Sequence, residues 1–564
     1  MSRVVIASVA AILFSAVSVA QTPASLSPGF GQPPRDTSAQ TGTAIIRGHV
    51  FDAASGQPIR KAQIRALSPE SRENRLAITD VSGAYEFKDL PAGRYSLNAS
   101  KGSYVGLSYG QTRPLEPGKT LDVRNAQLLD KVDFNLPHGA VVTGRILDEF
   151  GDPIDEVMVM AMRYQYMTGR KQLMSTGRSG MTNDVGEFRI YGLPPGQYVI
   201  SATYRSGNVV AFGNSSSGDR SGYAPTYYPG TANVADAQRL TIGVGQKVSD
   251  LTIALLPTRM ARISGIAVDS EGRPLAQAMV MTMQTSLGGM MSSGGQVKPD
   301  GTFTVDNVAP GDYTLRVLPR SSPGANSSEE TIQAEVSVNG DDIDGIRLVG
   351  VKPSKLTGRV IPSASQTNAS LASLQLVATP ANPPALGAGG IGRSRVNDDG
   401  TFEMSVAPGK SYIRMSVAGP FANTRLKAVR LNGVDVIDTG IEVRPNENID
   451  GVEVELTTQL SSVSGGVTDA RGNAVRDYTV ITFARDRERW GPGSRYLNSA
   501  RPNQEGTFKI NLPQGDYYAI ALAYVEQGAN TDPEFLDSVK ERATEFSINE
   551  AETKSLDLKL VTGM

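Results

Sequence analysis

The sequence predicts an all-β protein, a tandem array of about five antiparallel β-sandwich domains with few short helices. Three observations predict it: a pattern that recurs about every hundred residues, turn signals within each copy, and alternating strands around those turns. The 564 residues also exceed what one core holds, because domains usually span roughly 100–150 residues. With 39% apolar residues, 59 Gly and 33 Pro, the composition is typical of a globular protein rich in turns.

The first part of the recurring pattern is a short opening strand with a glycine at its centre, mostly followed by a Gly-x-Pro turn. The first copy is Ile46-Arg47-Gly48-His49-Val50, followed by Gly56-Gln57-Pro58. The central glycines of the five copies are Gly48, Gly144, Gly265, Gly358 and Gly465. The fourth and fifth copies lack the proline of the turn, so their boundaries are less sharply defined.

The second part is a tight hairpin turn before an aromatic residue, as in Asp80-Val81-Ser82-Gly83-Ala84-Tyr85. The hairpin glycines are Gly83, Gly186, Gly301, Gly400 and Gly506, and they are separated by 103, 115, 99 and 106 residues. Such turns need a backbone with positive φ, which glycine supplies at no steric cost. The aromatic residue that follows is expected to point into the core.

The third part is a Pro-x-Gly or Pro-Gly turn before a tyrosine and an alternating strand, as in Pro91-Ala92-Gly93-Arg94-Tyr95. The five tyrosines are Tyr95, Tyr198, Tyr313, Tyr412 and Tyr517. We expect each ring to pack in the core while its hydroxyl group reaches nearby backbone. A second alternating strand closes each copy, for example Val132-x-Phe134-x-Leu136.

These patterns divide the chain into a leader, a linker and five repeats. The expected bounds are 1–20 for a signal peptide, 21–42 for a flexible linker, then 43–137, 138–257, 258–350, 351–457 and 458–564 for the first to fifth β-sandwich repeats. The second repeat carries a tyrosine-rich insertion. The best helix candidate runs from Asp532, which can cap it, to about Glu545, with Pro533 at its first position.

The three motifs resemble those of the carboxypeptidase regulatory-like domains, which are transthyretin- or prealbumin-like, Ig-like sandwiches. The first three repeats match nearly in full, and the fourth places Tyr412 one residue late. The whole chain resembles exported multi-repeat bacterial proteins built from such domains. This resemblance implies a fold that is also classed as carbohydrate-binding-like, but it implies no particular ligand, because a fold does not determine a function.

The N-terminus predicts export. Arg3 precedes an apolar run from Val4 to Val19, and small residues end at Ala20 before Gln21, as at a signal-peptidase site. With no cysteine, neither a lipid anchor at the cleavage site nor a disulfide can form. We therefore expect a periplasmic, extracellular or cell-surface protein with no membrane span after signal cleavage.

Chemistry-bearing residues are sparse, and no enzyme is predicted. The only histidines, His49 and His138, fall in different repeats, so neither a zinc site nor a Ser-His-Asp triad is expected. The acidic pairs Asp341-Asp342 and Asp398-Asp399 could bind Ca²⁺, but turn formation is the favoured interpretation. No catalytic residue, cofactor or metal is predicted. A net charge of −2 offers no field for nucleic acid.

Two loops supply the candidate ligand-binding residues. They are Tyr223, Tyr227 and Tyr228 in the insertion of the second repeat and Trp490, the only tryptophan, in the fifth. Exposed aromatic loops of a rigid sandwich can stack sugar rings or hold peptides, or they can cover the open edges of their own sandwich. The preferred function is a non-catalytic exported structural or adhesive scaffold with a cell-envelope protein or glycan as partner. The alternative is glycan recognition through these loops. The oligomeric state is left open.

Overall fold

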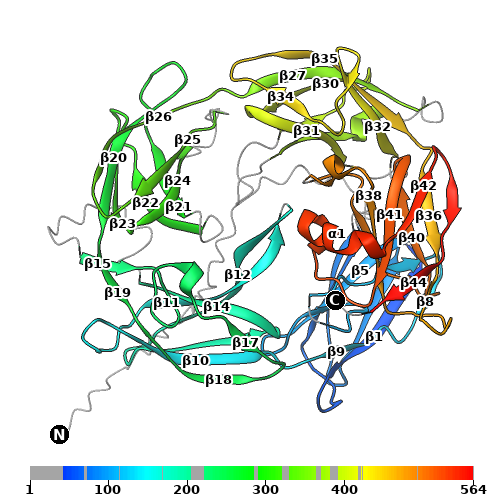
Figure 1. Cartoon of the computed structure of the whole chain (residues 1–564), viewed down its shortest axis with the longest axis horizontal. Helices are drawn as coiled ribbons and strands as arrows, with labels where there is room; N and C mark the ends of the chain where they lie inside the picture. The colour runs from blue at the N-terminus through cyan, green and yellow to red at the C-terminus, as the bar shows by residue number, and fades with distance from the viewer. Residues whose placement is uncertain are drawn as a thin grey trace, which may run out of the picture. The chain divides into compact units, whose positions relative to one another are not determined.

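The computed structural model confirms the predicted tandem β-sandwich array (Figure 1). It describes residues 42–562 except 69–72, 114, 168, 205–220, 285–289, 320–329, 364–369, 382–391, 417–420, 422–423 and 492. The predicted signal peptide, all but the last residue of the predicted linker and most of the insertion lie outside the described residues. Among the described residues, no helix is long and apolar enough to cross a membrane.

The first repeat consists of two facing sheets. One has the strand order β4-β1-β8 with β9 also on β1, and the other has the order β3-β2-β5-β6 with β7 also on β5. The strands are β1 (Ala44–Asp52), β2 (Gln63–Ser68), β3 (Glu73–Ile78), β4 (Ala84–Leu90), β5 (Gly93–Ser100), β6 (Leu107–Ser108), β7 (Leu121–Val123), β8 (Leu128–Leu129) and β9 (Phe134–Leu136). Alternating residues of both sheets form the core, because a half-buried strand turns every second side chain inward.

The second repeat has the sheets β13-β10-β18 and β12-β11-β14-β16, with β17 also on β14, and the ribbon β15-β19. Its elements are β10 (Ala140–Leu147), β11 (Val157–Met167), β12 (Arg170–Met181), β13 (Glu187–Leu193), β14 (Gly196–Tyr204), β15 (Ser221–Ala224), β16 (Thr226–Tyr227), the 3₁₀ turn η1 (Val234–Asp236), β17 (Leu240–Ile242), β18 (Lys247–Ala254) and β19 (Leu256–Arg259).

The third and fourth repeats follow the same plan. The third has sheets β23-β20-β26 and β22-β21-β24-β25, and the fourth has β30-β27-β35-β32-β33 and β29-β28-β31-β34. Their elements are β20 (Ala261–Val268), β21 (Ala278–Gln284), β22 (Met290–Gln296), β23 (Thr302–Val308), β24 (Gly311–Pro319), β25 (Gln333–Val338), β26 (Ile343–Val349), β27 (Ser354–Ile361), η4 (Leu371–Ser373), β28 (Gln375–Pro380), β29 (Gly392–Arg395), β30 (Thr401–Val406), β31 (Gly409–Ser416), β32 (Arg425–Leu431), β33 (Val434–Asp435), β34 (Ile441–Val443) and β35 (Ile449–Thr457).

The fifth repeat has sheets β40-β36-β43 and β37-β44-β41-β38-β39, with β42 also on β41. Its elements are β36 (Ser461–Gly465), β37 (Val467–Thr468), β38 (Thr479–Ala484), η6 (Arg487–Trp490), β39 (Asn498–Ala500), β40 (Phe508–Leu512), β41 (Gly515–Leu522), η7 (Ala529–Thr531), α1 (Pro533–Val539), η8 (Lys540–Arg542), β42 (Thr544–Ile548), β43 (Thr553–Ser555) and β44 (Leu558–Val561).

The helix α1 is shorter than the sequence predicts. The carboxylate of Asp532 caps it by accepting the backbone N–H of Glu534, as expected. The chain then tightens into η8 and becomes extended at Ala543, because Thr544–Ile548 forms strand β42 on β41. The predicted last turn of the helix is therefore strand, and tertiary pairing overrides the local helical pattern.

Each opening strand lies between one antiparallel and one parallel neighbour. In the first repeat β1 runs antiparallel to β4 and parallel to the closing strand β9, and the other four repeats use the same arrangement. The parallel pair is a departure from the purely antiparallel pairing that the sequence predicts. It arises because the chain crosses to the other sheet and returns before the closing strand forms.

The tyrosine corner forms in four repeats. The hydroxyl groups of Tyr95, Tyr198, Tyr313 and Tyr517 each donate to a backbone carbonyl four residues earlier in the chain, while the rings lie in the core. Tyr412 differs, since it comes one position late and is half-buried with the Arg414 guanidinium 4.9 Å from its ring centroid. Tyr412, which the sequence places one residue late, thus also lies in a different environment from the other four tyrosines.

Replacing Tyr313 by phenylalanine is expected to lower the stability of the third repeat by about 1 kcal/mol, because the Ala309 carbonyl loses its hydrogen bond while the ring stays packed. Hydrogen exchange of peptides from β24 measures the change. Tyr412→Phe is the matched control and should leave β31 unchanged. Equal losses in the two variants would contradict a structural role for the corner hydroxyl.

Candidate functional site

Trp490, one of the four candidate ligand-binding residues, is not exposed. Its side chain is 3% exposed, its indole Nε1 donates to the Ala484 carbonyl at 2.7 Å, and its ring contacts Phe483 edge-on. With α1, it covers the outer face of strand β38 in a second apolar cluster. The expected exposure of Trp490 is therefore wrong, because β38 is apolar on both faces and needs a cover.

The three tyrosines of the insertion lie in different environments. Tyr227 is 2% exposed and covers the outer face of the sheet of the second repeat, so its expected exposure is also wrong. Tyr223 and Tyr228 are half-buried against the core of the same repeat. The Tyr223 hydroxyl donates to Glu149, and burial raises its pKa to about 12. The structure does not gather these residues with Trp490, and ligand binding by the four stays a prediction.

Residues of both acidic pairs considered for calcium accept hydrogen bonds from the chain itself. Asp399 accepts the backbone N–H and the hydroxyl of Thr401, and Asp342 accepts the backbone N–H of Arg262. These hydrogen bonds lower the pKa of Asp399 below its usual range. No group of three or more potential ligands gathers around a metal position in the described part of the chain.

A polar cluster lies where the first repeat joins the second. Asp52, at the end of β1, accepts the Tyr104 hydroxyl at 3.0 Å and lies 2.8 Å from Nε2 of His138 at the start of the second repeat. The Tyr104 and His138 rings are stacked with centroids 4.4 Å apart. Hydrogen bonds from the Ser55 backbone, the Ala54 backbone and Tyr104 lower the pKa of Asp52 to about 2. The carboxylate thus ties the start of the second repeat to the first repeat.

We expect this cluster to make the first repeat sensitive to strong acid. Because the folded pKa of Asp52 is depressed, its contribution is present above the ordinary value near 3.8 and is lost as the pH falls through about 2. The loss should be on the order of 1 kcal/mol, since the site adjoins solvent. Hydrogen exchange of β1 between pH 4 and pH 2 measures it. Asp52→Asn should remove the pH dependence, and a persistent dependence would contradict the assignment.

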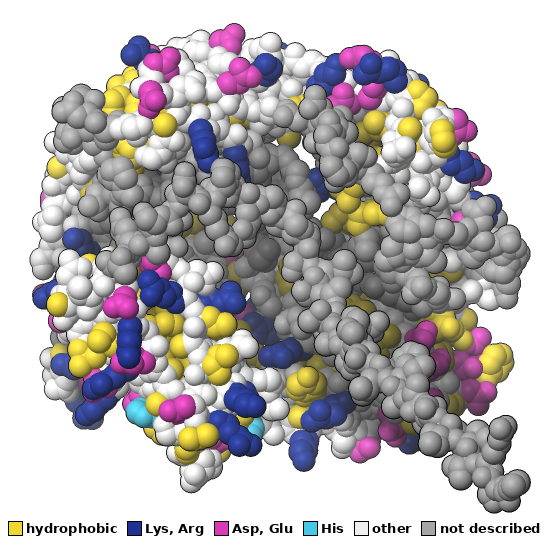
Figure 2. All heavy atoms as spheres, turned by 180° about the vertical axis from the view of Figure 1, so that it is seen from behind, with side chains coloured by type: hydrophobic (Ala, Val, Ile, Leu, Met, Phe, Trp, Pro, Cys, Tyr) yellow, Lys and Arg dark blue, Asp and Glu magenta, His cyan; other side chains and the backbone are white. Residues whose placement is uncertain are grey.

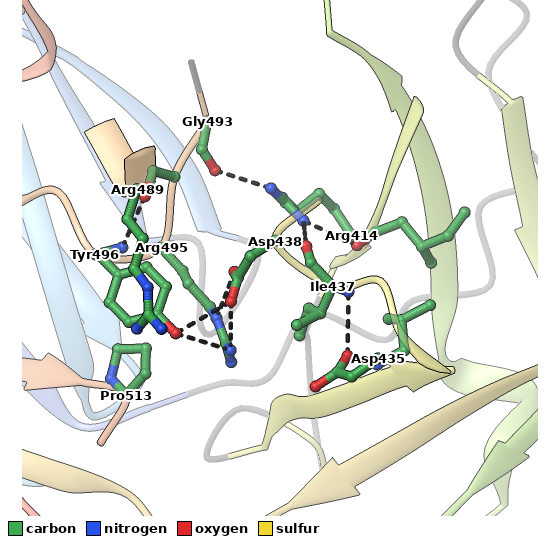
Figure 3. Close-up of polar contacts among 12 residues, drawn as sticks. Arg414, Asp435, Ile437, Asp438, Arg489, Gly493, Arg495, Tyr496 and Pro513 are labelled. Carbon is green, nitrogen blue, oxygen red and sulfur yellow. Dashed lines mark hydrogen bonds and ion pairs between the residues drawn. The ribbon is translucent and has the colours of Figure 1, made fainter. Parts of the chain in front are cut away.

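The fourth and fifth repeats contact each other through a second polar cluster (Figure 3). The Arg495 guanidinium binds both carboxylate oxygens of Asp438 at 2.9 Å, and the Tyr496 hydroxyl donates to the same carboxylate at 3.0 Å. On the other side Arg414 donates to the Gly493 carbonyl at 3.0 Å. A bidentate pair fixes orientation as well as distance, so this contact sets the junction.

The first and fifth repeats also share a buried ion pair. Arg501 Nη1 lies 2.7 Å from the Glu116 carboxylate, and the two side chains are 3% and 0% exposed. Arg501 also donates to the Pro117 carbonyl and to Asp477, which in turn accepts the hydroxyl of Thr112. The first and the fifth repeat are therefore in polar contact.

Next to this contact lies an open cleft of about 630 Å³, formed by residues of the first, second and fifth repeats. We call it the basic cleft. Its lining residues are Arg113, Leu115, Arg163, Tyr164, Lys171, Pro195, Gly196, Gln197, Tyr198, Val199, Arg239, Tyr524 and Glu526. Four of these are cationic and one is acidic. On the face drawn in Figure 2, basic and acidic side chains are interspersed.

The sequence motifs did not point to the basic cleft. Its residues come from three repeats, and proximity across repeats leaves no local pattern. One signal was present: Arg163 interrupts the apolar run of β11, and it is 8% exposed in the folded chain. A charged residue at a buried strand position is uncommon and marks a place to examine.

Comparison with known proteins gives one family match. The model of the carboxypeptidase regulatory-like domain matches residues 45–129. No sequence among the curated proteins matches the chain.

Three similar solved structures come from bacteria. The TIE protein of Bacillus anthracis is 12% identical, with 75% of this chain and 73% of that chain covered and a TM-score of 0.14. A minor pilin of Streptococcus agalactiae is 13% identical over 38% of this chain and 95% of its own, with a TM-score of 0.22. Two B repeats of the collagen binding protein of Staphylococcus aureus are 12% identical over 74% and 100%, with a TM-score of 0.13. The match of the family model identifies a carboxypeptidase regulatory-like domain in the first repeat.

Proposed function

We propose that the protein is an exported, non-catalytic scaffold whose β-sandwich repeats hold or space a component of the cell envelope. The observation that carries this proposal is the way the repeats are joined. Each repeat has its own apolar core, and neighbours are fixed by side-chain contacts such as Arg495 with Asp438 and His138 with Asp52. Such contacts keep binding surfaces at set distances.

The scaffold proposal is supported by how the polar side chains are used. Asp399 holds a turn, Asp342 accepts a hydrogen bond from the opening strand of the third repeat, and the two histidines contact aspartates of the first repeat, His49 near Asp133 and His138 near Asp52. The partner is expected to be a cell-envelope protein or glycan. Export follows from the apolar segment of residues 4–19 and the small residues that end at Ala20.

Cell fractionation with in vivo crosslinking tests this function. The full chain should be found outside the cytoplasm with its first twenty residues removed, and it should crosslink to envelope components. A chain without residues 1–20 is the matched control and should stay in the cytoplasm. Cytoplasmic location of the full chain, or turnover of a substrate by purified protein, would contradict the proposal.

A further inference from the structure

We propose that the basic cleft binds a carboxylated oligosaccharide, a short chain of sugar rings that each carry a carboxylate. This inference is independent of the scaffold function, and it places a ligand away from Tyr223, Tyr227, Tyr228 and Trp490. It depends on cations that form no ion pair among the described residues, on aromatic rings that orient those cations, and on the open form of the cleft.

Arg163 is the first of these cations. It is 8% exposed, and its Nε has no hydrogen-bond partner among the described residues. Its guanidinium interacts with the hydroxyl of Tyr198. A buried guanidinium without an anion is costly, and a carboxylate in the cleft would supply the missing partner.

The position of Arg163 is specific to the second repeat. It follows Met162, which pairs with Val199, so the register places Arg163 opposite the corner residue Tyr198. The residues opposite the corner tyrosine in the third, fourth and fifth repeats are Gln284, Thr379 and Ala484. Because these three are neutral, the fold itself does not require a charge here.

The other three cations are exposed and rest against tyrosine rings. Arg239 lies 4.8 Å from the ring centroid of Tyr164, and Arg113 lies 5.9 Å from that of Tyr524. Lys171 lies 5.3 Å from the ring centroid of Tyr166. Such cation–π contacts hold a charged group in place without neutralising it.

None of the four cations forms an ion pair within the described residues. The ion pairs of the described chain engage other Lys and Arg side chains, such as Arg495 with Asp438 and Arg145 with Glu187. Glu526 is the one acid of the lining, so four positive charges face one negative charge. The cleft thus has an excess of three positive charges, whereas the chain as a whole carries −2.

The chemistry of the lining favours a sugar acid over a small compact anion. Guanidinium groups bind carboxylates through two parallel hydrogen bonds, and several cations along one cleft can engage successive carboxylates. Leu115, Pro195 and the tyrosine rings offer apolar surface for ring faces, while Gln197 and tyrosine hydroxyls offer partners for sugar hydroxyls. An open cleft of about 630 Å³ also admits part of a longer chain.

Isothermal titration of the full chain with trigalacturonate tests the proposal. We expect saturable binding that weakens at least tenfold between 50 mM and 500 mM NaCl, because exposed charges are screened. Arg239→Gln and Lys171→Gln should each weaken binding about three- to tenfold, and both residues are exposed enough that the fold should survive. Arg393→Gln is the matched control, since Arg393 is exposed in β29 and forms no ion pair among the described residues.

Several results would overturn the proposal. No binding of trigalacturonate would do so, as would equal binding of the neutral trisaccharide maltotriose. If inorganic phosphate bound as tightly as trigalacturonate, the basic cleft would be a site for simple anions and not a site for sugar acids. An equal loss of affinity in the Arg393→Gln variant would show that binding follows the net charge of the protein and not the basic cleft.

Discussion

Alanine in place of Gly48 is expected to destabilise the first repeat by about 3 kcal/mol, near the upper end for overpacked sites. A Cβ atom at this position would lie 2.0 Å from the carbonyl oxygen of Val132 and 2.5 Å from its carbonyl carbon. Both atoms belong to the backbone beside the closing strand, so no side chain can move aside. The glycine is required because the segment between β8 and β9 runs beside the opening strand and comes very close to it at Val132.

Hydrogen exchange of peptides from β1 and β4 in the full chain measures this loss repeat by repeat. Gly102→Ala is the matched control in the same repeat, because a Cβ there meets nothing within 4 Å. The control should change stability by less than about 0.5 kcal/mol. Similar losses for Gly48→Ala and Gly102→Ala would contradict the steric explanation.

Methionine in place of Arg501 is expected to weaken the contact between the first and fifth repeats by about 3–5 kcal/mol. Removal of one partner of a buried pair leaves the other charge without compensation. Here the remaining charge is Glu116, which is fully buried, and the Pro117 carbonyl loses its donor as well. Limited proteolysis and hydrogen exchange of residues 111–119 measure the release of this segment.

Two further variants test whether the weakened contact results from the charge left on Glu116 or from the change of side chain at position 501. Adding Glu116→Gln to Arg501→Met should restore much of the protection, because the uncompensated charge disappears. Arg471→Met is the control, since Arg471 is an exposed turn residue of the same repeat. If Arg501→Met leaves residues 111–119 as protected as in the unaltered chain, the ion pair does not hold the two repeats together.

The fold could be predicted from the sequence because its signals are local. The hairpin glycines Gly83, Gly186, Gly301, Gly400 and Gly506 all adopt the positive φ that their turns predict. The corner tyrosines follow their Pro-x-Gly turns with a hydroxyl contact only four residues away. Information within ten residues was enough to place these parts.

We did not predict which residues cover the outer faces of the sheets, although the sequence carried a signal that these faces are buried. Strand β38 reads Thr479–Ala484 and is buried at every position, and β14 has a similar run from Tyr198 to Ala202. Runs without alternation predict a strand covered on both faces. Trp490 and Tyr227, which we predicted as candidate ligand-binding residues, belong to the apolar clusters that provide the cover.

The contacts between repeats could not be predicted in the same way. Arg501 and Glu116 are separated by 385 residues, and the motifs around them are the same as in repeats without such a pair. The basic cleft combines residues from three repeats. Pairing over such distances depends on how folded units meet, which repeat motifs do not encode.

The parallel pairing of opening and closing strands has a mechanical consequence. In the second repeat β10 and β18 run side by side in the same direction, so the chain enters at one end of the pair and leaves at the other. A pull on the two ends would load the hydrogen bonds of this ladder in shear, and they would have to rupture together. An antiparallel pair pulled at adjacent ends would instead unzip one bond at a time. Every repeat is therefore built to resist tension along the chain.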